Sequence, residues 1–291
     1  MSSSSEVCVC IRQCKVEDVN TLMEFAEKQN WDYSMYDYWA YTRLDHEFLL
    51  VAIDASGAPV GFGGINRNPC DTLYLSSFIV REDLRQKGIG RKIWKALMDR
   101  VGDKNVALDG APEMHDWYEK QGFVHTSYEV LFYTITKSNF TQTENQSNYK
   151  LVPLSDDMWP SLMVYDKQVY PDIDREQILR AWFTGKDVKI VIALDDNAIV
   201  GYGSIHKKSE NKYGLRNVFA DNESVFENIL YELFSNIPDV SNVHFLLIDK
   251  KPLPNCLCSS LYDNERTQRM YTKFPIQINT EKVWLATAHF L

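Results

Sequence analysis

The sequence predicts an α/β protein, an α+β arrangement around a mixed sheet, in which one structural unit occurs twice in tandem and the second copy is degenerate. Two observations support this prediction. Apolar, β-prone runs at residues 49–54 and 60–65 return at residues 190–195 and 200–205, an offset of about 140 residues. A segment with helical spacing of apolar residues, 91–101, follows a third such run. Two copies of one αβ unit explain the recurrence most simply.

Length and composition limit the possible functions. The chain has 291 residues, enough for one large domain or two ordinary ones. Hydrophobic residues make up 45% and charged residues 24%, as in folded globular proteins. The net charge of −9 does not support a nucleic-acid partner and is compatible with cationic amine substrates. No apolar run reaches the roughly 18 residues of a membrane helix and no secretory signal is visible, so we expect a cytoplasmic protein without a membrane partner.

The cysteines do not suggest a metal site. Their spacing matches neither a zinc signature nor the pattern of a secreted disulfide framework. We interpret them as structural thiols and expect no metal. The six residues are Cys8, Cys10, Cys14, Cys70, Cys256 and Cys258.

The elements of the first copy follow in order. Residues 48–53 and 60–65 are predicted strands, and Asp54-Ala55-Ser56-Gly57 between them predicts a hairpin turn. Another β-prone run covers residues 73–80, and a short strand is expected at residues 106–108. The helix expected at 91–101 lies between these two strands.

The loop between the third strand and this helix has the features of an anion site. Main-chain N–H groups converge at a helix N-terminus, where the helix dipole also favours negative charge. Gly88 and Gly90 let the backbone approach a diphosphate without a Cβ in the way. Nearby basic residues supply charge-assisted contacts: Arg85, Lys87, Arg91 and Lys92. Neither a Walker loop nor a Rossmann fingerprint fits, because the required Gly-Lys-Ser/Thr and third glycine are missing.

Together these features resemble the GCN5-related N-acetyltransferase (GNAT) superfamily, in which Arg/Gln-x-x-Gly-x-Gly/Ala binds the pyrophosphate of acyl-coenzyme A. The resemblance covers about residues 9–135, with Arg85-x-x-Gly88-x-Gly90 as this motif. It implies acetyl-CoA, or another acyl-CoA, as co-substrate. It also implies that the end of the preceding strand and the loop bind the acyl-CoA donor. The N–H groups of the strand would stabilise the oxyanion of the tetrahedral reaction intermediate. The residues implied are Phe78, Ile79, Val80, Arg85, Gln86, Lys87, Gly88, Ile89, Gly90 and Arg91.

The same resemblance implies a proton donor. In this superfamily a tyrosine shortly before Gly-Phe often protonates the leaving thiolate, and Tyr118 stands before Gly122-Phe123. The alternative is a helix tyrosine that only packs beside Trp117 and Phe123.

The second copy departs from the first at the loop. After the run ending at Phe219 come Asp221, Asn222 and Glu223, without glycine, and acids at a helix start predict capping and not phosphate binding. We therefore expect an N-terminal GNAT domain binding acyl-CoA at 1–137, a linker at 138–149 and a degenerate GNAT-like domain at 150–291. With residues 108–114 and 269–273, this tandem arrangement resembles the YitH-type acetyltransferases.

The general base is left open among three residues. Asp109, Glu113 and His115 follow the strand at 106–108 and could line the active site, with Glu113 slightly preferred. Asp109 beside Gly110 could equally form a turn, and the other two could be solvated residues at a helix start.

Six aromatic side chains lie within residues 31–41. Either they form an acceptor cleft in which Asp32 or Asp37 holds an ammonium group, or they belong to the core of an amphipathic helix; we slightly favour the core.

The expected function is N-acylation of a primary amine of a small molecule by direct attack on acyl-CoA. Three alternatives remain: acylation of a protein or peptide lysine, acyl-CoA binding without catalysis, and an interaction module. The sequence does not determine the acyl chain, the acceptor or the oligomeric state.

Overall fold

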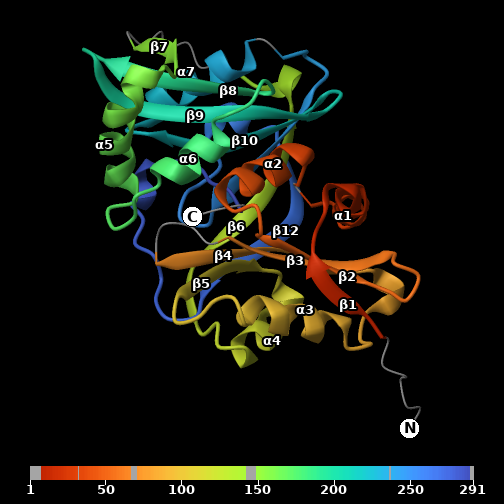
Figure 1. Ribbon diagram of the computed structural model, residues 1–291. Coiled ribbons are helices and arrows are strands. Elements are labelled where there is room, and N and C mark those ends of the chain that lie inside the picture. The colour runs from red at the N-terminus through yellow and green to blue at the C-terminus, as the bar shows by residue number, and fades with distance from the viewer. Residues whose placement is uncertain (1–7, 32, 67–70, 142–148, 236, 289–291) are drawn as a thin grey trace. The chain divides into compact units, whose positions relative to one another are not determined.

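The computed structural model describes residues 8–31, 33–66, 71–141, 149–235 and 237–288. The chain divides into two compact units, Met1–Leu108 and Asp109–Leu291. The ribbon of each unit is drawn in Figure 1.

The first unit is a sheet flanked by helices. Strands β1 to β4 pair antiparallel in chain order, and β5 runs parallel to β4. In order the elements are β1 (Cys10–Gln13), η1 (Val16–Asp18), α1 (Val19–Lys28), α2 (Met35–Leu44), β2 (Leu49–Ile53), β3 (Pro59–Asn66), β4 (Thr72–Val80), η2 (Glu82–Leu84), α3 (Ile89–Met98) and β5 (Asn105–Gly110). The predicted strands are therefore present, and the expected helix begins at Ile89, inside the glycine motif.

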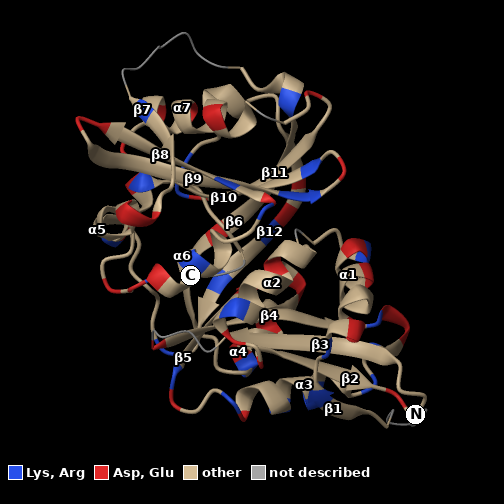
Figure 2. Cartoon of the chain, turned by 45° about the horizontal axis from the view of Figure 1, so that its top comes forward, with Lys and Arg blue, Asp and Glu red and all other residues tan. Residues whose placement is uncertain are grey.

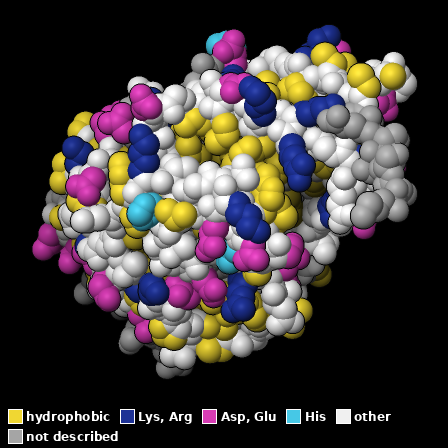
Figure 3. Space-filling model, turned by 90° about the horizontal axis from the view of Figure 1, so that it is seen from below, with side chains coloured by type: hydrophobic (Ala, Val, Ile, Leu, Met, Phe, Trp, Pro, Cys, Tyr) yellow, Lys and Arg dark blue, Asp and Glu magenta, His cyan; other side chains and the backbone are white. Residues whose placement is uncertain are grey.

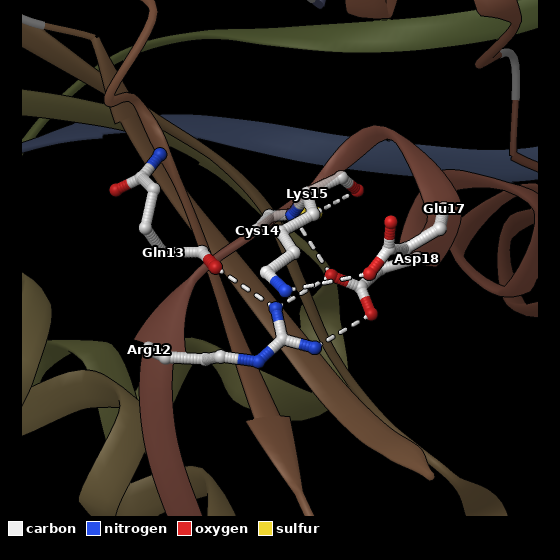
Figure 4. A network of polar contacts seen from close by, with 6 residues as sticks. All are labelled: Arg12, Gln13, Cys14, Lys15, Glu17 and Asp18. Carbon is white, nitrogen blue, oxygen red and sulfur yellow. Dashed lines mark hydrogen bonds and ion pairs between the residues drawn. The ribbon is translucent and has the colours of Figure 1, made fainter. Parts of the chain in front are cut away.

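An ion pair secures the start of this unit. The guanidinium of Arg12, on β1, donates to both carboxylate oxygens of Asp18 at 2.7 and 2.9 Å (Figure 4). Asp18 also accepts from the main-chain N–H of Lys15 at 2.8 Å, which caps η1. The carboxylate is buried, so it links β1 to the turn that leads into α1.

Two glycines of β3 let α3 approach the sheet closely. A Cβ on Gly61 would lie 2.9 Å from Ile93 Cδ1, and one on Gly63 would lie 2.6 Å from Ile93 Cγ2. Because side chains alternate along a strand, Phe62 points to the opposite face, where its ring meets Phe25 of α1 at 5.8 Å. Helix α3 and the pair α1 and α2 thus cover opposite faces of the sheet (Figure 1).

The second unit is built on a larger sheet. Its strands lie in the order β12-β6-β11-β10-β9-β8-β7, all neighbours antiparallel except β10 and β11, and β13 pairs with β10. The elements are η3 (Pro112–Met114), α4 (His115–Lys120), β6 (His125–Thr136), η4 (Lys137–Asn139), β7 (Lys150–Pro153), η5 (Asp156–Met158), α5 (Trp159–Val169), α6 (Glu176–Trp182), β8 (Val188–Asp195), β9 (Ala198–Ser209), β10 (Lys212–Ala220), α7 (Glu223–Phe234), β11 (Asn242–Ile248), η6 (Asn255–Leu257), β12 (Leu261–Tyr271), η7 (Thr280–Lys282) and β13 (Val283–Leu285).

The predicted repeat is visible in the packing of β9. A Cβ on Gly201 or Gly203 would lie 2.8 to 2.9 Å from side chains of α7. Tyr202, between them, points to the other face and meets Tyr165 of α5 at 6.1 Å. The sequence Gly-aromatic-Gly therefore has the same structural role in both copies. Its glycines allow one helix to pack closely on the sheet, and its aromatic ring packs on the opposite face.

Strand β6 joins the sheet of the second unit. It pairs antiparallel with β11 from Val130 to Thr136, and with β12 along the opposite edge. The compact units consequently meet in sequence at residues 108 and 109, ahead of β6. The division at 137 and 150 that the sequence suggests stays a prediction, and much of the proposed linker, residues 142–148, lies outside the described part of the chain.

Candidate active site

The loop between β4 and α3 has the backbone geometry of an anion nest. The φ angles are −63° at Arg85, +63° at Gln86 and +85° at Gly88, while φ of Lys87 is not positive. Alternating signs of φ turn successive N–H groups toward one concavity. Gly88 is also the N-cap of α3, so Ile89, Gly90 and Arg91 form its first turn.

The N–H groups of this loop are available to a ligand. Within the described residues, the main-chain N–H groups of residues 86–91 donate to no protein acceptor. The first N–H groups of any helix have no intrahelical partner and add to the positive end of its dipole. An oxyanion such as a pyrophosphate is therefore the complementary ligand.

The basic side chains of the loop are held by main-chain carbonyls. Arg85 donates through Nε to the Val80 carbonyl at 3.3 Å and through Nη2 to Gln29 Oε1 at 2.9 Å. Lys87 donates to the Asp83 carbonyl at 2.9 Å. Arg85 and Arg91 are exposed, and the basic residues of α3 are blue in Figure 2. These neutral partners leave both charges of the loop side chains available to an anion.

Gly90 has room around it within the protein. A Cβ there would lie 3.6 Å from Phe78 Cζ and 3.7 Å from Val80 Cγ2, which is ordinary contact. The fold of the first unit therefore does not require glycine at position 90. This contrasts with Gly63, where a Cβ would collide with α3.

Strand β4 extends beyond its pairing with β5 just before the loop. The parallel pairing with β5 ends at Tyr74 and Ala107, while β4 continues to Val80. Arg81 N–H bonds the Val60 carbonyl on β3, so strand alternation directs the N–H groups of Val80 and Phe78 away from β3. Among the predicted strand residues, Ile79 is buried, and Phe78 packs edge-to-face on Trp94 at 5.5 Å.

In the second copy, the C-terminal strand lies where β10 and β11 stop pairing, and we call this place the groove of the second copy. Parallel pairing of β10 with β11 covers residues 212–214 and 242–244, as short as that of β4 with β5. Strand β13 then pairs with Val218 and Phe219 of β10, and Ala286 donates to the Leu246 carbonyl of β11 at 2.8 Å. The C-terminal strand thus occupies the gap between the diverging strands.

The start of α7 is closed as well. Asn222 Oδ1 accepts from the N–H of Val225 at 3.0 Å, as expected for a cap. The Trp284 indole donates to the Ala220 carbonyl at 3.0 Å and stacks on Phe226 in the first turn. The helix is therefore capped by Asn222 and not by the acids on which the prediction rested, and the Trp284 side chain covers its first turn.

Tyr118 lies on α4 in the second unit and is buried. Its ring packs against Trp117 at 5.3 Å and Phe123 at 6.1 Å. Burial, reinforced by the charge of Glu113, raises the pKa of Tyr118 well above its ordinary value. The phenol consequently stays protonated at neutral pH, as a proton donor must.

The three base candidates have different surroundings. The side chain of Asp109 is buried and forms a two-pronged ion pair with Arg269, at 2.6 and 2.9 Å. His115 Nε2 is 2.9 Å from the Gly110 carbonyl. Glu113 is exposed on η3. Its charge also contributes, after burial and Asp263, to the raised pKa of Glu265.

The aromatic segment at 31–41 divides into two groups. Tyr38 and Tyr41 are buried and pack on Phe48, as expected for the core. Asp37 accepts from Ser34 N–H at 2.9 Å and caps α2, a role that the spacing Ser34-x-x-Asp37 could have indicated. Asp32 lies outside the described residues. Three further side chains are exposed: Trp31, Met35 and Trp39.

The sequence singled out Arg269 only within the resemblance at residues 269–273, without a role, and did not single out β13. Both act through contacts with residues distant in the sequence. Among the described residues, His, Cys, Asp and Glu side chains form no group of three or more suited to a metal ion. A search of the same residues found no helix with the length and apolar character needed to span a membrane.

Comparisons with known sequences place both halves in one family. Models of the acetyltransferase (GNAT) domain match residues 10–143 and residues 162–284. A holothin acyltransferase from a Pseudoalteromonas species (strain SANK 73390) is 22% identical over 237 residues, which span 80% of this chain and 76% of the relative. An uncharacterised protein from Caenorhabditis elegans is 26% identical over 192 residues, 60% of each chain.

Solved structures share the fold. A candidate acetyltransferase from Pyrococcus horikoshii has a TM-score of 0.76 and 18% identity, with 97% of this chain and 95% of that chain covered. A tandem GNAT protein from the clavulanic acid biosynthesis pathway has a TM-score of 0.65 and 14% identity, with 91% and 98% covered. Since both halves match the same family and the duplicated fold agrees, the chain belongs to the GNAT acetyltransferase family and carries two such domains in tandem.

Proposed function

We propose that the protein is an acyl-CoA-dependent N-acyltransferase that moves an acyl group, most simply acetyl, to a primary amine of a small molecule. The observation that carries this proposal is the run of N–H groups at residues 86–91 around the open nest. In a GNAT domain this loop is where the donor's pyrophosphate binds. The part of β4 that continues beyond its pairing with β5 would then receive the pantetheine arm, and the N–H groups near Phe78 and Val80 would stabilise the oxyanion.

The reaction is direct transfer. The amine nitrogen attacks the thioester carbonyl carbon, the C–N bond forms, and the resulting oxyanion collapses with cleavage of the C–S bond. Tyr118 gives its phenolic proton to the departing thiolate, and the nitrogen loses a proton to a base or a water relay. The products are an amide and free CoA.

Among the base candidates, Glu113 suits this role best. It is exposed and can reach solvent or substrate, whereas Asp109 would have to give up two hydrogen bonds to Arg269 before accepting a proton. His115 donates through Nε2 to the Gly110 carbonyl, so only its Nδ1 could accept a proton. We therefore assign Asp109 a structural role.

One donor site per chain is proposed, in the first copy. The groove of the second copy contains β13, and Trp284 covers the first turn of α7. For the acceptor we keep the small amine that the sequence analysis expects. The acidic balance of the chain favours a cation, and the holothin acyltransferase relative supports acyl transfer.

The decisive experiment separates donor binding from catalysis. Gly90→Glu and Gly90→Gln have nearly the same size, and both should be tolerated in the first turn of α3. We expect Gly90→Glu to lose acetyl-CoA binding by calorimetry, because its carboxylate occupies the nest, and Gly90→Gln to lose less. Equal, wild-type affinity in both variants would refute the donor site.

Thiol release from acetyl-CoA, and from longer acyl-CoAs, over a set of amines then tests transfer. Rapid release with a small amine supports the proposal. Rapid release only with lysine peptides would reassign the acceptor, and donor binding without release would identify a non-catalytic acyl-CoA-binding protein.

A further inference from the structure

We propose that Arg269, on β12 of the C-terminal half, is a positioning residue for acyl transfer. In this role it fixes the segment from Asp109 to Tyr118 on which the proposed proton donor lies. The inference rests on the proposed function, and its experiment includes a measurement that does not depend on activity.

The contacts of Arg269 are those of a fixed support. Its side chain is 1% exposed and that of Asp109 5%. Nε and Nη2 each donate to one carboxylate oxygen of Asp109, and Nη2 also donates to the Thr287 carbonyl at 3.2 Å. The guanidinium carbon is 5.4 Å from the centre of the Tyr128 ring. A planar fork held on several sides fixes the orientation of a carboxylate, which a lysine could not do.

The pairing of β6 with β12 is irregular opposite Arg269. It joins Gln268 to Glu129 and Met270 to Thr126, so β6 has one extra residue here, and its Ser127 and Tyr128 lie opposite the single Arg269. Such bulges interrupt the regular ladder and are common beside active sites. Strand β12 carries both acidic and basic residues, which are red and blue in Figure 2.

The support extends from Asp109 toward Tyr118. The next residue, Gly110, offers its carbonyl to the ring of His115 at the start of α4. Met114 N–H donates to the Ala111 carbonyl at 2.9 Å, which closes the turn between them. Residues 109–115 thus form a hydrogen-bonded turn anchored at its first residue by Arg269, and Tyr118 lies one helical turn later.

This arrangement gives the degenerate copy a function without a ligand of its own. Arg269 lies on β12, and Thr287 follows β13, so both groups around Asp109 come from the C-terminal end of the chain. A misplacement of about 1 Å in a catalytic group can lower a rate by about 10²-fold. The second copy would therefore be retained because it holds the catalytic segment.

The test is a double-mutant cycle with Arg269→Gln, Asp109→Asn and the double variant. The double variant leaves no buried charge without its partner, so it should fold even if the single variants are unstable. We expect kcat to fall by about 10²-fold in the double variant. Because the two side chains act as a unit, each single variant should lose at least as much, and the two losses should not add. CoA affinity should stay within about twofold, and the acidic limb of the pH profile of kcat should remain.

Further outcomes decide the proposal. Wild-type kcat in the double variant, or in the charge-retaining Arg269→Lys, would show that the fork does not position the segment and would overturn the inference. Loss of the acidic limb in Asp109→Asn alone would make Asp109 the base, with the same consequence. Hydrogen exchange of residues 109–120 provides the independent readout. If Arg269 positions this segment, hydrogen exchange should be faster in the double variant than in the wild type, and unchanged exchange would refute the positioning role. This result does not depend on activity. A wild type that transfers no acyl group would refute only the proposed function.

Discussion

Gln86 and Gly88 both have φ in the left-handed region, but only one of them is a glycine. A side chain in this region costs roughly 1 kcal/mol, and such strain is concentrated at binding and catalytic sites. The loop therefore keeps an unfavourable backbone conformation at Gln86 that turns its N–H groups inward. This conformation is the one expected of the proposed anion site, and within the described residues the N–H groups of 86–91 donate to no protein acceptor.

Tyr118→Phe tests the proton donor. The ring packing with Trp117 and Phe123 is retained, so the free energy of unfolding should change little. Turnover should fall by about 10²–10⁴-fold while CoA affinity is kept, because only proton donation is lost. Steady-state kinetics and calorimetry measure the two quantities, and an unchanged turnover would remove Tyr118 from the mechanism.

The ionisation of Asp18 should make the stability of the first unit depend on pH. Burial opposes ionisation, but the hydrogen bonds from Arg12 and Lys15 outweigh it and lower the pKa of Asp18 below its ordinary value. The folded-state pKa lies below the unfolded one, near ~3.9, so the stabilisation is present above that pH and is lost as the pH falls through the folded value. Asp18→Asn should cost about 1–3 kcal/mol at pH 7. In urea unfolding the difference from wild type should shrink toward pH 3, and a constant difference would contradict this account.

At the level of elements, each copy depends on glycines that allow one helix to approach the sheet. Gly61 and Gly63 serve α3, as Gly201 and Gly203 serve α7. Helix α3, whose N-terminus forms part of the nest, can therefore pack closely on β3 because Gly61 and Gly63 have no side chains. Its N-terminus, by contrast, has open space at Gly90. Gly63 is thus required by helix packing, whereas packing within the protein does not require Gly90.

This difference gives a matched pair of variants. Gly63→Ala puts a Cβ 2.6 Å from Ile93 and 2.7 Å from Leu97, so it should destabilise the protein by about 1–3 kcal/mol. Gly90→Ala meets no close contact and should be neutral or stabilising by up to about 1 kcal/mol, since alanine favours a helix. Thermal unfolding of both variants checks this, and equal losses would show that the close approach is not the cause.

For the whole molecule, the two copies differ where their parallel central strands stop pairing. In the first copy β4 continues beyond its pairing with β5, while in the second β13 lies between β10 and β11. The surface carries charges of both signs. On the face drawn in Figure 3, Lys and Arg side chains are interspersed with Asp and Glu and with hydrophobic residues. This face therefore has no broad basic surface among its described residues.

Binding stoichiometry tests the two grooves together. Calorimetric titration with CoA should give one site per chain, because β13 and Trp284 occupy the second groove. Gly90→Glu should then abolish all binding, not half of it. Two sites in the wild type, or residual tight binding in the variant, would show that the second groove is accessible.

The sequence alone determined the features that depend on neighbouring residues. Apolar, β-prone runs indicated the central strands of both copies, and the spacing of Gly88 and Gly90 after such a run indicated the nest, since turn geometry and helix capping are local. The tertiary structure alone decided which distant segments meet. Asp109 pairs with Arg269 across 160 residues, β6 lies between β11 and β12, and β13 fills the second groove. These contacts depend on the order of strands in a sheet, and hydrophobic periodicity, which gives each strand its buried face, does not specify its neighbours.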